Sequence, residues 1–447
     1  MNEEWSRLTP AQKLEARFSE WSSAPGVQFA TPGAERAYRE RTQMFKDVTQ
    51  LKKPVRVPIA LNVGIFPYAY AGVTVQDVMY DYEKLGLAFK KFNQDFTTDS
   101  LSTCIFGAPG KVFDILDYKL YRWPGHGVSP TSSYQCVEDE YMRADEYDQF
   151  IADPSNYFLR VYLPRIFGAL QPWSMLPPLT DILELPFVGA SLIPAGLPPV
   201  QEAFKKYLEA GQAALEWIQA AGAIDGWSTA NLGLPPLWAG ISKAPFDTLG
   251  DTLRGTRAIM LDKFRQPAKL LAALDRILPL AIEMGVRWAT NQHGVFAFIP
   301  LHKGADGFMS DEDFRTFYWP TLKGLILGLV NEGVVPWLFV EGGYNQRLDV
   351  IADRDIPAGT TVWIFDRTDM KEVKKRFTGW ACFGGNVPAS LLQAGTPEDV
   401  RSYVRRLIDD VAGDGGFILA NGAVLDHAKP ENLRAMIDAG REYGVYR

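Results

Sequence analysis

The chain has 447 residues, of which 47% are hydrophobic and 13% aromatic, so it can bury a large core in one elaborate domain or in two. Its net charge of −7 argues against a general nucleic-acid-binding protein, which would carry a basic face. Cys104, Cys136 and Cys382 cannot all pair and have no Cys-x-x-Cys spacing, which predicts a reducing, cytoplasmic location. The polar N-terminus is unlike a signal peptide, and no apolar run reaches the roughly 18 residues that a membrane span needs.

Two regions are predicted from the pattern of apolar residues. Residues 1–55 have the pattern of a helical extension, and the main domain is predicted to occupy residues 56–447. The first strand of that domain is expected at 57–61, where a short apolar run follows Arg56. It is followed by an expected helix from Thr74, another over 82–93, and a strand over 99–106.

Residues 107–200 interrupt the alternation of predicted strands and helices because they are rich in proline and glycine. They are predicted to be an insertion of short helices and loops. Long irregular stretches in compact domains are often lids over a site, although simple decoration of the surface is the alternative.

A helix over 201–221 is expected next. It carries Phe204, Leu208, Leu215 and Ile218 on one stripe, where Gly211 either weakens the helix or marks the close approach of a neighbour. The remaining expected elements are a short strand and a proline-rich loop in 223–247, helices over 250–262 and 267–285, a strand over 295–300, and helices over 311–332 (kinked at Pro320), 397–412 and 430–443.

Four buried strands in residues 334–426 each end in a polar or glycine-rich corner. The corners are Glu341-Gly342-Gly343, Asp366, Gly384-Gly385-Asn386, and Asn421-Gly422 followed by Asp426-His427. Apolar runs that alternate with helices favour a parallel sheet. Seven or eight such units predict an α/β fold of the (β/α)8 TIM-barrel class, with a doubly wound open sheet as the alternative.

Several motifs in the last third of the chain occur in a fixed order. They are Met309–Phe314 with Tyr318–Pro320, Phe383–Pro388, Leu391–Val400, Gly415–Ala420, and Lys429–Met436 with Tyr443-Gly444. In this order they resemble the uroporphyrinogen decarboxylase superfamily, most specifically in Gly-Asn-Val-Pro and Gly-Thr-Pro-Glu-x-Val. The resemblance implies a barrel whose site lies at its carboxyl-terminal mouth, and members of the family often pair as homodimers.

The superfamily includes decarboxylases of heme synthesis and methyltransferases that work with corrinoid proteins. The decarboxylases grip substrate carboxylates with an arginine-rich loop, but the matching loop here, residues 64–72, has no arginine. The thiol methyltransferases bind zinc through a His-x-Cys pair and a later cysteine. These positions fall on Phe339, Glu341 and Ala423, so zinc binding in the usual form is not expected.

The candidate site residues follow predicted strands. Glu341, His302 and Asp366 are predicted to be catalytic, and Glu341 and His302 would be the ligands of any metal. Predicted substrate-binding residues are Phe66, Tyr68 and Tyr70 as an aromatic wall, with Lys303, Asn386 and His427. Each has a plain structural alternative, such as packing, helix capping or, for Glu341, an ion pair with Arg347 or Arg367. His293 is predicted to be structural, and Asp369 to be a helix N-cap.

The residues and the resemblance together predict a methyltransferase of the demethylase type. It would move a methyl group from a small methylated or methoxylated compound to a corrinoid on a partner protein. Two alternatives stay open: a lyase or decarboxylase of the same fold acting on a non-porphyrin substrate, and a barrel that binds a small molecule without catalysis.

Overall fold

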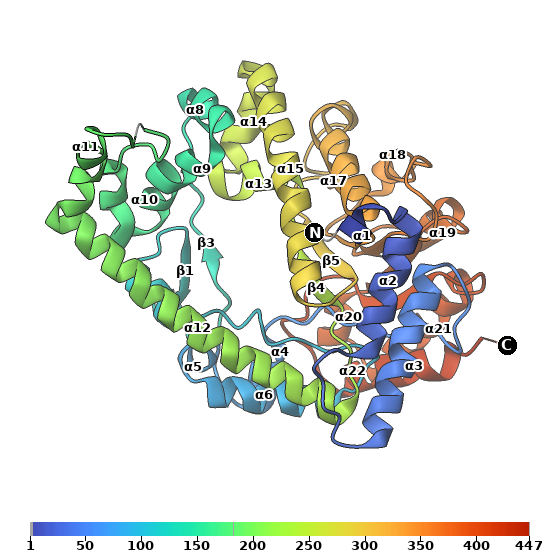
Figure 1. The fold of residues 1–447 in the computed structure, drawn as a ribbon. Coiled ribbons are helices and arrows are strands. Elements are labelled where there is room, and N and C mark those ends of the chain that lie inside the picture. Colours follow the sequence, from blue (N-terminus) through green and yellow to red (C-terminus); the bar gives the residue numbers. More distant parts are fainter. Residues whose placement is uncertain (1–2, 182, 447) are drawn as a thin grey trace.

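Six parallel strands form one continuous sheet in the computed structural model, which describes residues 3–181 and 183–446 (Figure 1). Each strand hydrogen-bonds to the next in chain order. The strands are β4 (Trp238–Ile241), β5 (Phe296–Leu301), β6 (Val335–Val340), β7 (Val362–Phe365), β8 (Cys382–Val387) and β9 (Phe417–Asn421).

Two extended segments close this sheet into a barrel. The Ala60 amide donates to Leu419 O on β9 at 3.0 Å, and the Asp99 amide donates to Ile59 O at 3.0 Å. The Leu101 amide then donates to Pro235 O, just before β4, at 2.9 Å. The two segments are joined to the sheet by isolated hydrogen bonds and bridges rather than by regular ladders. In the first of them Pro58 has no N–H to donate. With them the barrel has eight strand positions, and the predicted (β/α)8 fold is confirmed.

The strands alternate between the barrel interior and the surrounding helices. On β6, Val335, Trp337 and Phe339 face the interior, whereas Leu338 and Val340 pack with the helical layer. This period of two follows from the pleat of a strand. A polar residue directly after a strand therefore points toward the barrel axis if it continues the alternation of the inward-facing side chains.

The N-terminal helices cover the barrel floor. Phe18 and Trp21 of α2 (Pro10–Ser23) pack edge-on against Phe296 at 6.0 and 5.5 Å between ring centroids. Phe45 of α3 (Pro32–Thr49) lies 6.4 Å from Trp337. His293 also lies at this end, where its Nδ1 is 2.7 Å from Glu20 on α2.

The other helices surround the barrel or build the insertion. The α-helices are α1 (Glu3–Ser6), α4 (Phe66–Ala71), α5 (Val75–Tyr80), α6 (Tyr82–Asp95), α7 (Gly110–Leu116), α8 (Tyr147–Ala152), α9 (Pro154–Tyr157), α10 (Leu163–Ile166), α11 (Val188–Leu192), α12 (Pro198–Leu232), α13 (Pro245–Thr248), α14 (Thr256–Arg265), α15 (Pro267–Asn291), α16 (Asp311–Asp313), α17 (Trp319–Asn331), α18 (Leu348–Ile351), α19 (Met370–Phe377), α20 (Ala389–Ala394), α21 (Pro397–Val411) and α22 (Pro430–Tyr443). The π-helical and 3-10 turns are η1 (Ala144–Glu146), η2 (Phe158–Tyr162), η3 (Gly168–Met175), η4 (Ile193–Gly196), η5 (Leu249–Leu253), η6 (Phe314–Tyr318) and η7 (Asn345–Arg347).

Two helix predictions need correction. α12 runs through to Leu232, beyond the predicted end at 221, because it meets no strong stop before Gly233, whose φ of 64° ends it. The predicted helix over 311–332 is divided into α16, the π-helical turn η6 and α17. Pro320 lies in the first turn of α17, where a missing N–H costs least.

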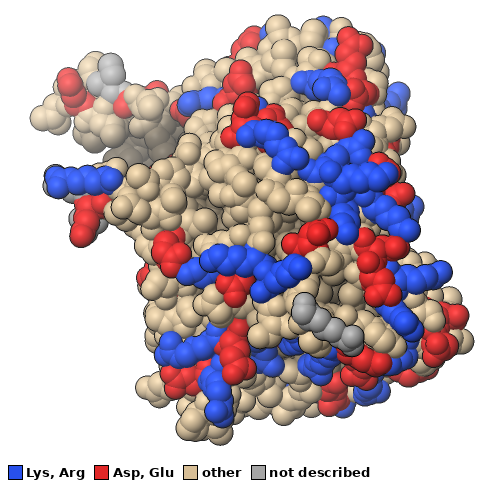
Figure 2. All heavy atoms as spheres, turned by 90° about the vertical axis from the view of Figure 1, so that its right-hand side faces the viewer, with Lys and Arg blue, Asp and Glu red and all other residues tan. Residues whose placement is uncertain are grey.

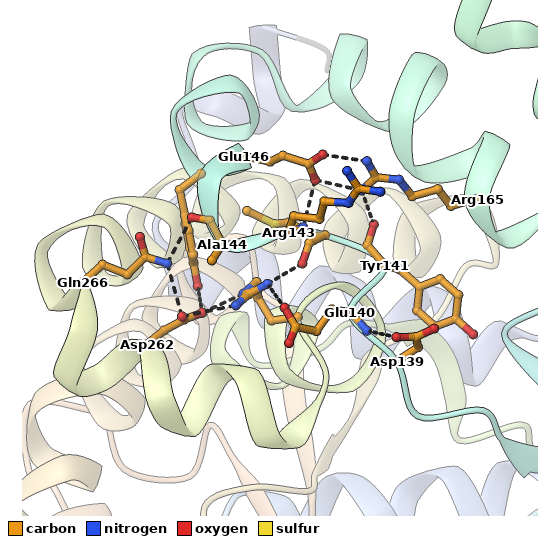
Figure 3. A network of polar contacts seen from close by, with 12 residues as sticks. Asp139, Glu140, Tyr141, Arg143, Ala144, Glu146, Arg165, Asp262 and Gln266 are labelled. Carbon is orange, nitrogen blue, oxygen red and sulfur yellow. Dashed lines mark hydrogen bonds and ion pairs between the residues drawn. The ribbon is translucent and has the colours of Figure 1, made fainter.

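The insertion carries a small sheet of β1 (Tyr121–Pro124), β2 (Gly127–Val128) and β3 (Gln135–Cys136). A buried network ties the insertion to the barrel helices (Figure 3). Arg254 Nε donates to Asp262 at 2.6 Å, and Arg254 Nη1 lies 3.0 Å from Glu140 of the insertion. On the insertion side, Arg165 binds both oxygens of Glu146 at 2.6 and 2.7 Å.

Positive and negative side chains are interspersed over the face that carries the C-terminus (Figure 2). Many of them pair, as in Lys371–Asp410 between α19 and α21 at 3.1 Å and Arg376–Asp349 between α19 and α18 at 2.5 Å. Within residues 3–181 and 183–446, no helix is both long and apolar enough to cross a membrane.

Candidate active site

Strand register brings four predicted residues to one level at the barrel mouth. Leu301 pairs with Val340, Val340 with Phe365, and Phe365 with Gly385. The next residues on these strands are His302, Glu341, Asp366 and Asn386. Each of the four continues the inward-facing series of its strand, and all lie at the carboxyl ends, where barrels place their sites.

His302 makes the central contact of the site. Its Nδ1 lies 2.5 Å from Asp251 Oδ2, and its Nε2 lies 4.0 Å from Glu341 Oε1. Burial of the imidazole opposes its charged form, but the hydrogen bond and charge of Asp251 outweigh burial, so the pKa of His302 is raised. The carboxylate on Nδ1 directs Nε2 toward Glu341 and the mouth.

Asp247 fixes the turn that carries His302. It is fully buried, and its two oxygens accept the backbone amides of His302 and Lys303, each at 3.0 Å. The Tyr318 hydroxyl donates to the same carboxylate at 2.7 Å. Burial and the nearby Asp251 carboxylate raise the pKa of Asp247. Three donors on one buried carboxylate hold this loop in a single arrangement.

Glu341 is free of the structural ion pairs that the sequence left open. Arg347 pairs instead with Asp311 at 3.1 Å, and Arg367 lies 3.7 Å from Asp366. Burial raises the pKa of Glu341, and the carboxylates of Asp247, Asp366 and Asp251 raise it further against the opposing effect of His302. Glu341 thus holds a proton more tightly than an ordinary glutamate does.

Asp366 positions the loop that carries Glu341. Its Oδ2 accepts the amide of Gly342 at 3.1 Å, directly after Glu341 in the chain. Gly342 has a φ of 80°, a conformation in which a side chain would be strained. Asp366 therefore acts on the position of Glu341 as well as on its charge.

The side chain of Asn386 is hydrogen-bonded to neighbouring parts of the fold through both its nitrogen and its oxygen. Its amide nitrogen donates to the carbonyls of Asp366 and Thr368, each at 3.1 Å, and its side-chain oxygen accepts from Tyr403 at 3.0 Å. These contacts use its two donors and one acceptor position. In this structure Asn386 braces the ends of β7 and β8 rather than offering a free amide to a substrate.

Aromatic side chains lie one layer below the His302–Glu341 pair. Phe298 lies four positions before His302 on β5, and Phe339 lies two positions before Glu341 on β6. Their rings stack at 6.0 Å with an interplanar angle of 29°. Trp238 lies 4.7 Å from Phe298, and Phe106 lies 5.9 Å from Trp238. The Trp238 Nε1 is buried and has no hydrogen-bond partner among the described residues. This aromatic floor was not predicted, because its members are ordinary core residues in a strand pattern.

The predicted aromatic wall is divided between the core and the rim. Tyr68 is 3% exposed and packs against Phe89, so it belongs to the core here. Phe66 and Tyr70 stack at 5.8 Å and line a hollow of about 370 Å³ together with His427. The hydroxyl of Tyr70 donates to Asp95 at 2.8 Å. This hollow is not lined by His302 or Glu341 and lies on the rim between the first and last loops of the barrel.

Two lysines share the carboxylate that holds His302. Lys303 Nζ lies 2.7 Å from Asp251, and Lys243 Nζ lies 2.6 Å from it. Lys303 is buried, and its ammonium group lies on the Asp251 side. Lys243, Asp247 and Asp251 were not predicted. Asp247 and Asp251, four residues apart, lie on the helical turns α13 and η5, and Lys243 directly precedes them. This spacing after a strand was the available signal.

The insertion brings a tyrosine to the mouth. Tyr134, next to β3, stacks edge-on against Tyr121 of β1 at 5.3 Å. Surrounding protein raises the pKa of the Tyr134 phenol, and the charges of Asp426 and Glu341 raise it further. Tyr134 is 58% exposed, so this phenol is available to a ligand.

The residues at the mouth do not fit a zinc site. His302 and Glu341 supply two donors, whereas a catalytic zinc needs three protein ligands. Asp251, the next carboxylate, is already bonded by His302 Nδ1 and two lysines. Across the part of the chain that the structure describes, no group of three or more His, Cys, Asp and Glu side chains is arranged to hold a metal ion.

Comparisons with known proteins agree with this architecture. The family model of uroporphyrinogen decarboxylase (URO-D) matches residues 234–443, which span β4 to α22. These residues belong to the uroporphyrinogen decarboxylase superfamily. Among solved structures, a methyltransferase from Methanosarcina mazei superposes with a TM-score of 0.58 over 90% of this chain and 98% of that chain, at 14% identity. No curated protein matches the chain.

The URO-D match includes His302, Glu341, Asp366 and Asn386, and also Asp251 and Lys243. The loop at residues 64–72 and the insertion with Tyr134 lie outside it. The four residues at the strand ends and their supporting side chains therefore lie within the part of the chain that matches the family model.

Proposed function

We propose that this protein is a methyltransferase of the demethylase type, in which His302 and Glu341 act as the acid pair. The observation that carries the proposal is their geometry: Nε2 and Oε1 lie 4.0 Å apart at the strand ends, and the pKa of each group is raised. A leaving oxygen between them can take a proton from either.

The reaction begins with a methyl group bonded to the oxygen of a small substrate. The carbon–oxygen bond breaks, its electron pair stays on oxygen, and that oxygen takes the proton from the acid pair. The methyl group passes to a nucleophilic acceptor. Asp251 keeps His302 protonated until the transfer, and Asp366 holds the Glu341 loop in place.

The proposed substrate is a small aromatic ether that also carries an anionic group. The aromatic floor of Trp238, Phe298 and Phe106 offers an apolar surface under the acid pair. Lys243 and Lys303 share the single Asp251 carboxylate, which leaves positive charge beside His302 for a carboxylate of the ligand. A methoxybenzoate has all of these features.

The proposed methyl acceptor is a corrinoid carried by a partner protein, and the proposed location is the cytoplasm. The acceptor class follows from the superfamily resemblance and from a leaving group whose activation needs no zinc. The solved methyltransferase with the same fold supports methyl transfer as the reaction class.

The runner-up is a lyase that removes a carboxyl group from a non-porphyrin substrate, and the paired lysines favour it. A porphyrinogen is a poor fit. The loop that would hold its many carboxylates, residues 64–72, has no arginine.

The test is a turnover assay with free cob(I)alamin and a panel of methoxybenzoates, read by the absorbance change of methylcobalamin and by mass spectrometry of the phenol. We expect methyl transfer that falls at least 100-fold in Glu341→Gln and in His302→Gln. Glu312→Gln, a change on the exposed face of α16, is the matched control. Release of CO2 without methyl transfer would establish the lyase, and tight binding without turnover would establish a binding protein.

A further inference from the structure

The insertion supplies the cap of helix α14. The N-cap position of this helix is Gly255, which has no side chain to accept the first free amides of the helix. Glu138 of the insertion takes this role, because its Oε1 atom accepts the backbone amide of Thr256, the first residue of the helix. A carboxylate also has the charge that the N-terminal end of a helix favours. The insertion and the barrel therefore meet at the first turn of α14.

The backbone at this junction is shaped to receive the insertion. Gly255 has a φ of 74°, and a Cβ built there would lie 2.8 Å from the carbonyl oxygen of Asp139. The Met142 amide donates to Leu253 O, in the turn just before Gly255, at 2.7 Å. A side chain at position 255 would be strained and would push residues 138–142 away from the barrel. The contact at the first turn of α14 thus belongs to a docked segment rather than to a loose surface pair.

The hydroxyl group of Thr256 continues this contact toward the barrel mouth. It donates to Glu138 Oε2 at 3.3 Å and accepts from Lys303 Nζ at 3.1 Å. Only this direction is possible, because an ammonium group donates and cannot accept, whereas a carboxylate accepts. Glu138 therefore takes the hydroxyl proton and leaves the lone pairs of the hydroxyl oxygen for Lys303.

Lys303 connects Thr256 to the acid pair. Its Nζ atom lies 2.7 Å from Asp251 Oδ1, and Asp251 Oδ2 lies 2.5 Å from His302 Nδ1. Lys243 also contacts this carboxylate, at 2.6 Å. The Lys303 side chain is only 9% exposed, so its ammonium group needs the oxygen partners that these contacts supply. The hydroxyl of Thr256 takes one proton of Lys303 that would otherwise turn to Asp251, which leaves more of the carboxylate charge for His302.

The path of the Lys303 side chain is fixed by the turn that carries Asp251. A Cβ built on Gly250 would lie 2.7 Å from Cε and 2.8 Å from Cδ of Lys303, so the lysine stem packs directly on this backbone. The ring of Phe308 lies 5.3 Å from the Nζ atom. With its stem held in this way, the ammonium group divides its protons between Asp251 and Thr256. A change at one of these two partners therefore acts on the other.

We propose that Glu138 and Thr256 are positioning residues for His302, and that docking of the insertion completes the arrangement of the acid pair. The contacts run without a break through Glu138, Thr256, Lys303, Asp251 and His302. The acid pair then has its full hydrogen-bonded support only when the insertion lies on the barrel. The inference rests on the proposed function for the role of His302 as an acid, but its first test needs no turnover.

The hydrogen bond between His302 and Asp251 can be observed by NMR. Its Nδ1 proton is expected to give a downfield resonance, which is assigned by its loss in His302→Gln among the 4 histidines of the chain. In Thr256→Val, Lys303 loses one acceptor and turns its protons to Asp251, so we expect the resonance to move upfield. Thr256→Val keeps the backbone amide that Glu138 accepts, which separates the hydroxyl from helix capping. Thr256→Ser restores the hydroxyl and should restore the wild-type resonance.

Glu138 is tested against the residue that follows it. Glu138→Ala removes both acceptors of Thr256 and should move the same resonance upfield. Asp139→Asn is the matched control, because it removes the same charge from the same exposed segment, where the Asp139 carboxylate accepts the Glu140 amide within the insertion. Thermal melts by circular dichroism verify that each variant is folded. Equal shifts in Glu138→Ala and Asp139→Asn would overturn the proposal, as would an unmoved resonance in Thr256→Val.

Methyl transfer separates this inference from the proposed function. With an active wild type, we expect Thr256→Val to lower kcat about tenfold while KM changes by less than about twofold, and Thr256→Ser to recover the rate. An active wild type whose kcat and resonance are both unchanged in Thr256→Val overturns this inference alone. An inactive wild type whose resonance still moves in Thr256→Val overturns the proposed function alone.

Discussion

His302 Nδ1 lies 2.5 Å from the Oδ2 atom of Asp251, and this contact organises the mouth of the barrel. The carboxylate keeps the imidazole charged in spite of its burial, because the hydrogen bond outweighs the loss of hydration. It also directs the other ring nitrogen toward Glu341. The acidity of the proposed catalytic pair thus depends on a residue that comes from a different strand-end loop.

Replacing Asp251 is expected to lower the pKa of His302. In Asp251→Asn the imidazole stays buried but loses the charge that favours its protonated form. Proton NMR titration of the ring resonances measures this directly, because the chain has only 4 histidines. Asp114→Asn is the control, since Asp114 lies 3.0 Å from the exposed His126. An unchanged His302 titration in Asp251→Asn would contradict the dyad.

The coupling between His302 and Asp251 is expected to depend on pH. The raised folded pKa of His302 contributes stability that is fully present below about pH 6.5, its value in the unfolded chain, and is lost as pH rises through the folded pKa. The pKa of Asp251 is lowered, so this carboxylate stays charged throughout that window. A double-mutant cycle with Asp251→Asn and His302→Gln should give about 1–2 kcal/mol at pH 5.5 and less at pH 9. An equal coupling energy at pH 5.5 and pH 9 would mean that the interaction of His302 with Asp251 does not depend on the charge of the imidazole.

Glu341→Gln is expected to stabilise the fold while it removes activity. The folded protein disfavours the ionised carboxylate of Glu341. At neutral pH this lowers the free energy of unfolding of the wild type, and a neutral glutamine removes the effect. Because the Glu341 side chain is 40% exposed, solvent screening limits the gain to less than about 1 kcal/mol. Urea unfolding at pH 7.5 and pH 4 measures the difference in free energy of unfolding between Glu341→Gln and the wild type. This difference should be smaller at pH 4, where the glutamate is protonated.

Part of this site could be predicted from the sequence because its geometry is periodic. Every second side chain of β6 faces the barrel interior, and Glu341 continues this alternation. Asp366 does the same after β7, so the alternation alone predicts that both side chains face the barrel axis. The same reasoning found the eight-unit barrel.

The partners of these residues could not be predicted in the same way. Asp251 reaches His302 from a π-helical turn 51 residues earlier, and no periodicity links the two. Asn386 stands after glycines at a strand end, as a ligand-binding amide would, but Tyr403 on α21 occupies its oxygen. Which hydrogen bonds a side chain makes depends on loop paths that propensity and spacing do not specify.

Asn386→Asp is expected to destabilise the barrel rather than to change substrate binding. A carboxylate cannot donate to the carbonyls of Asp366 and Thr368, so two buried acceptors lose their donor. We expect a loss of about 2–4 kcal/mol in the free energy of unfolding. Tyr403→Phe, which removes one bond to the same side chain, should cost about 1 kcal/mol. A strong increase in KM with unchanged stability would instead show that Asn386 contacts the substrate.

Arg254→Ala is expected to release the insertion from the barrel. Arg254 and Asp262 are each 2% exposed and form an ion pair at 2.6 Å, and Arg254 also binds Met142 O and Glu140 of the insertion. Removing one partner of a buried pair leaves an unpaired charge and costs about 3–5 kcal/mol. The loss should appear first as faster proteolysis within residues 139–147, because this segment contacts the barrel through Arg254 (Figure 3). Arg257→Ala, an exposed change on α14 three residues after Arg254, should leave cleavage unchanged. Equal cleavage of the two variants would show that the network does not hold the insertion in place.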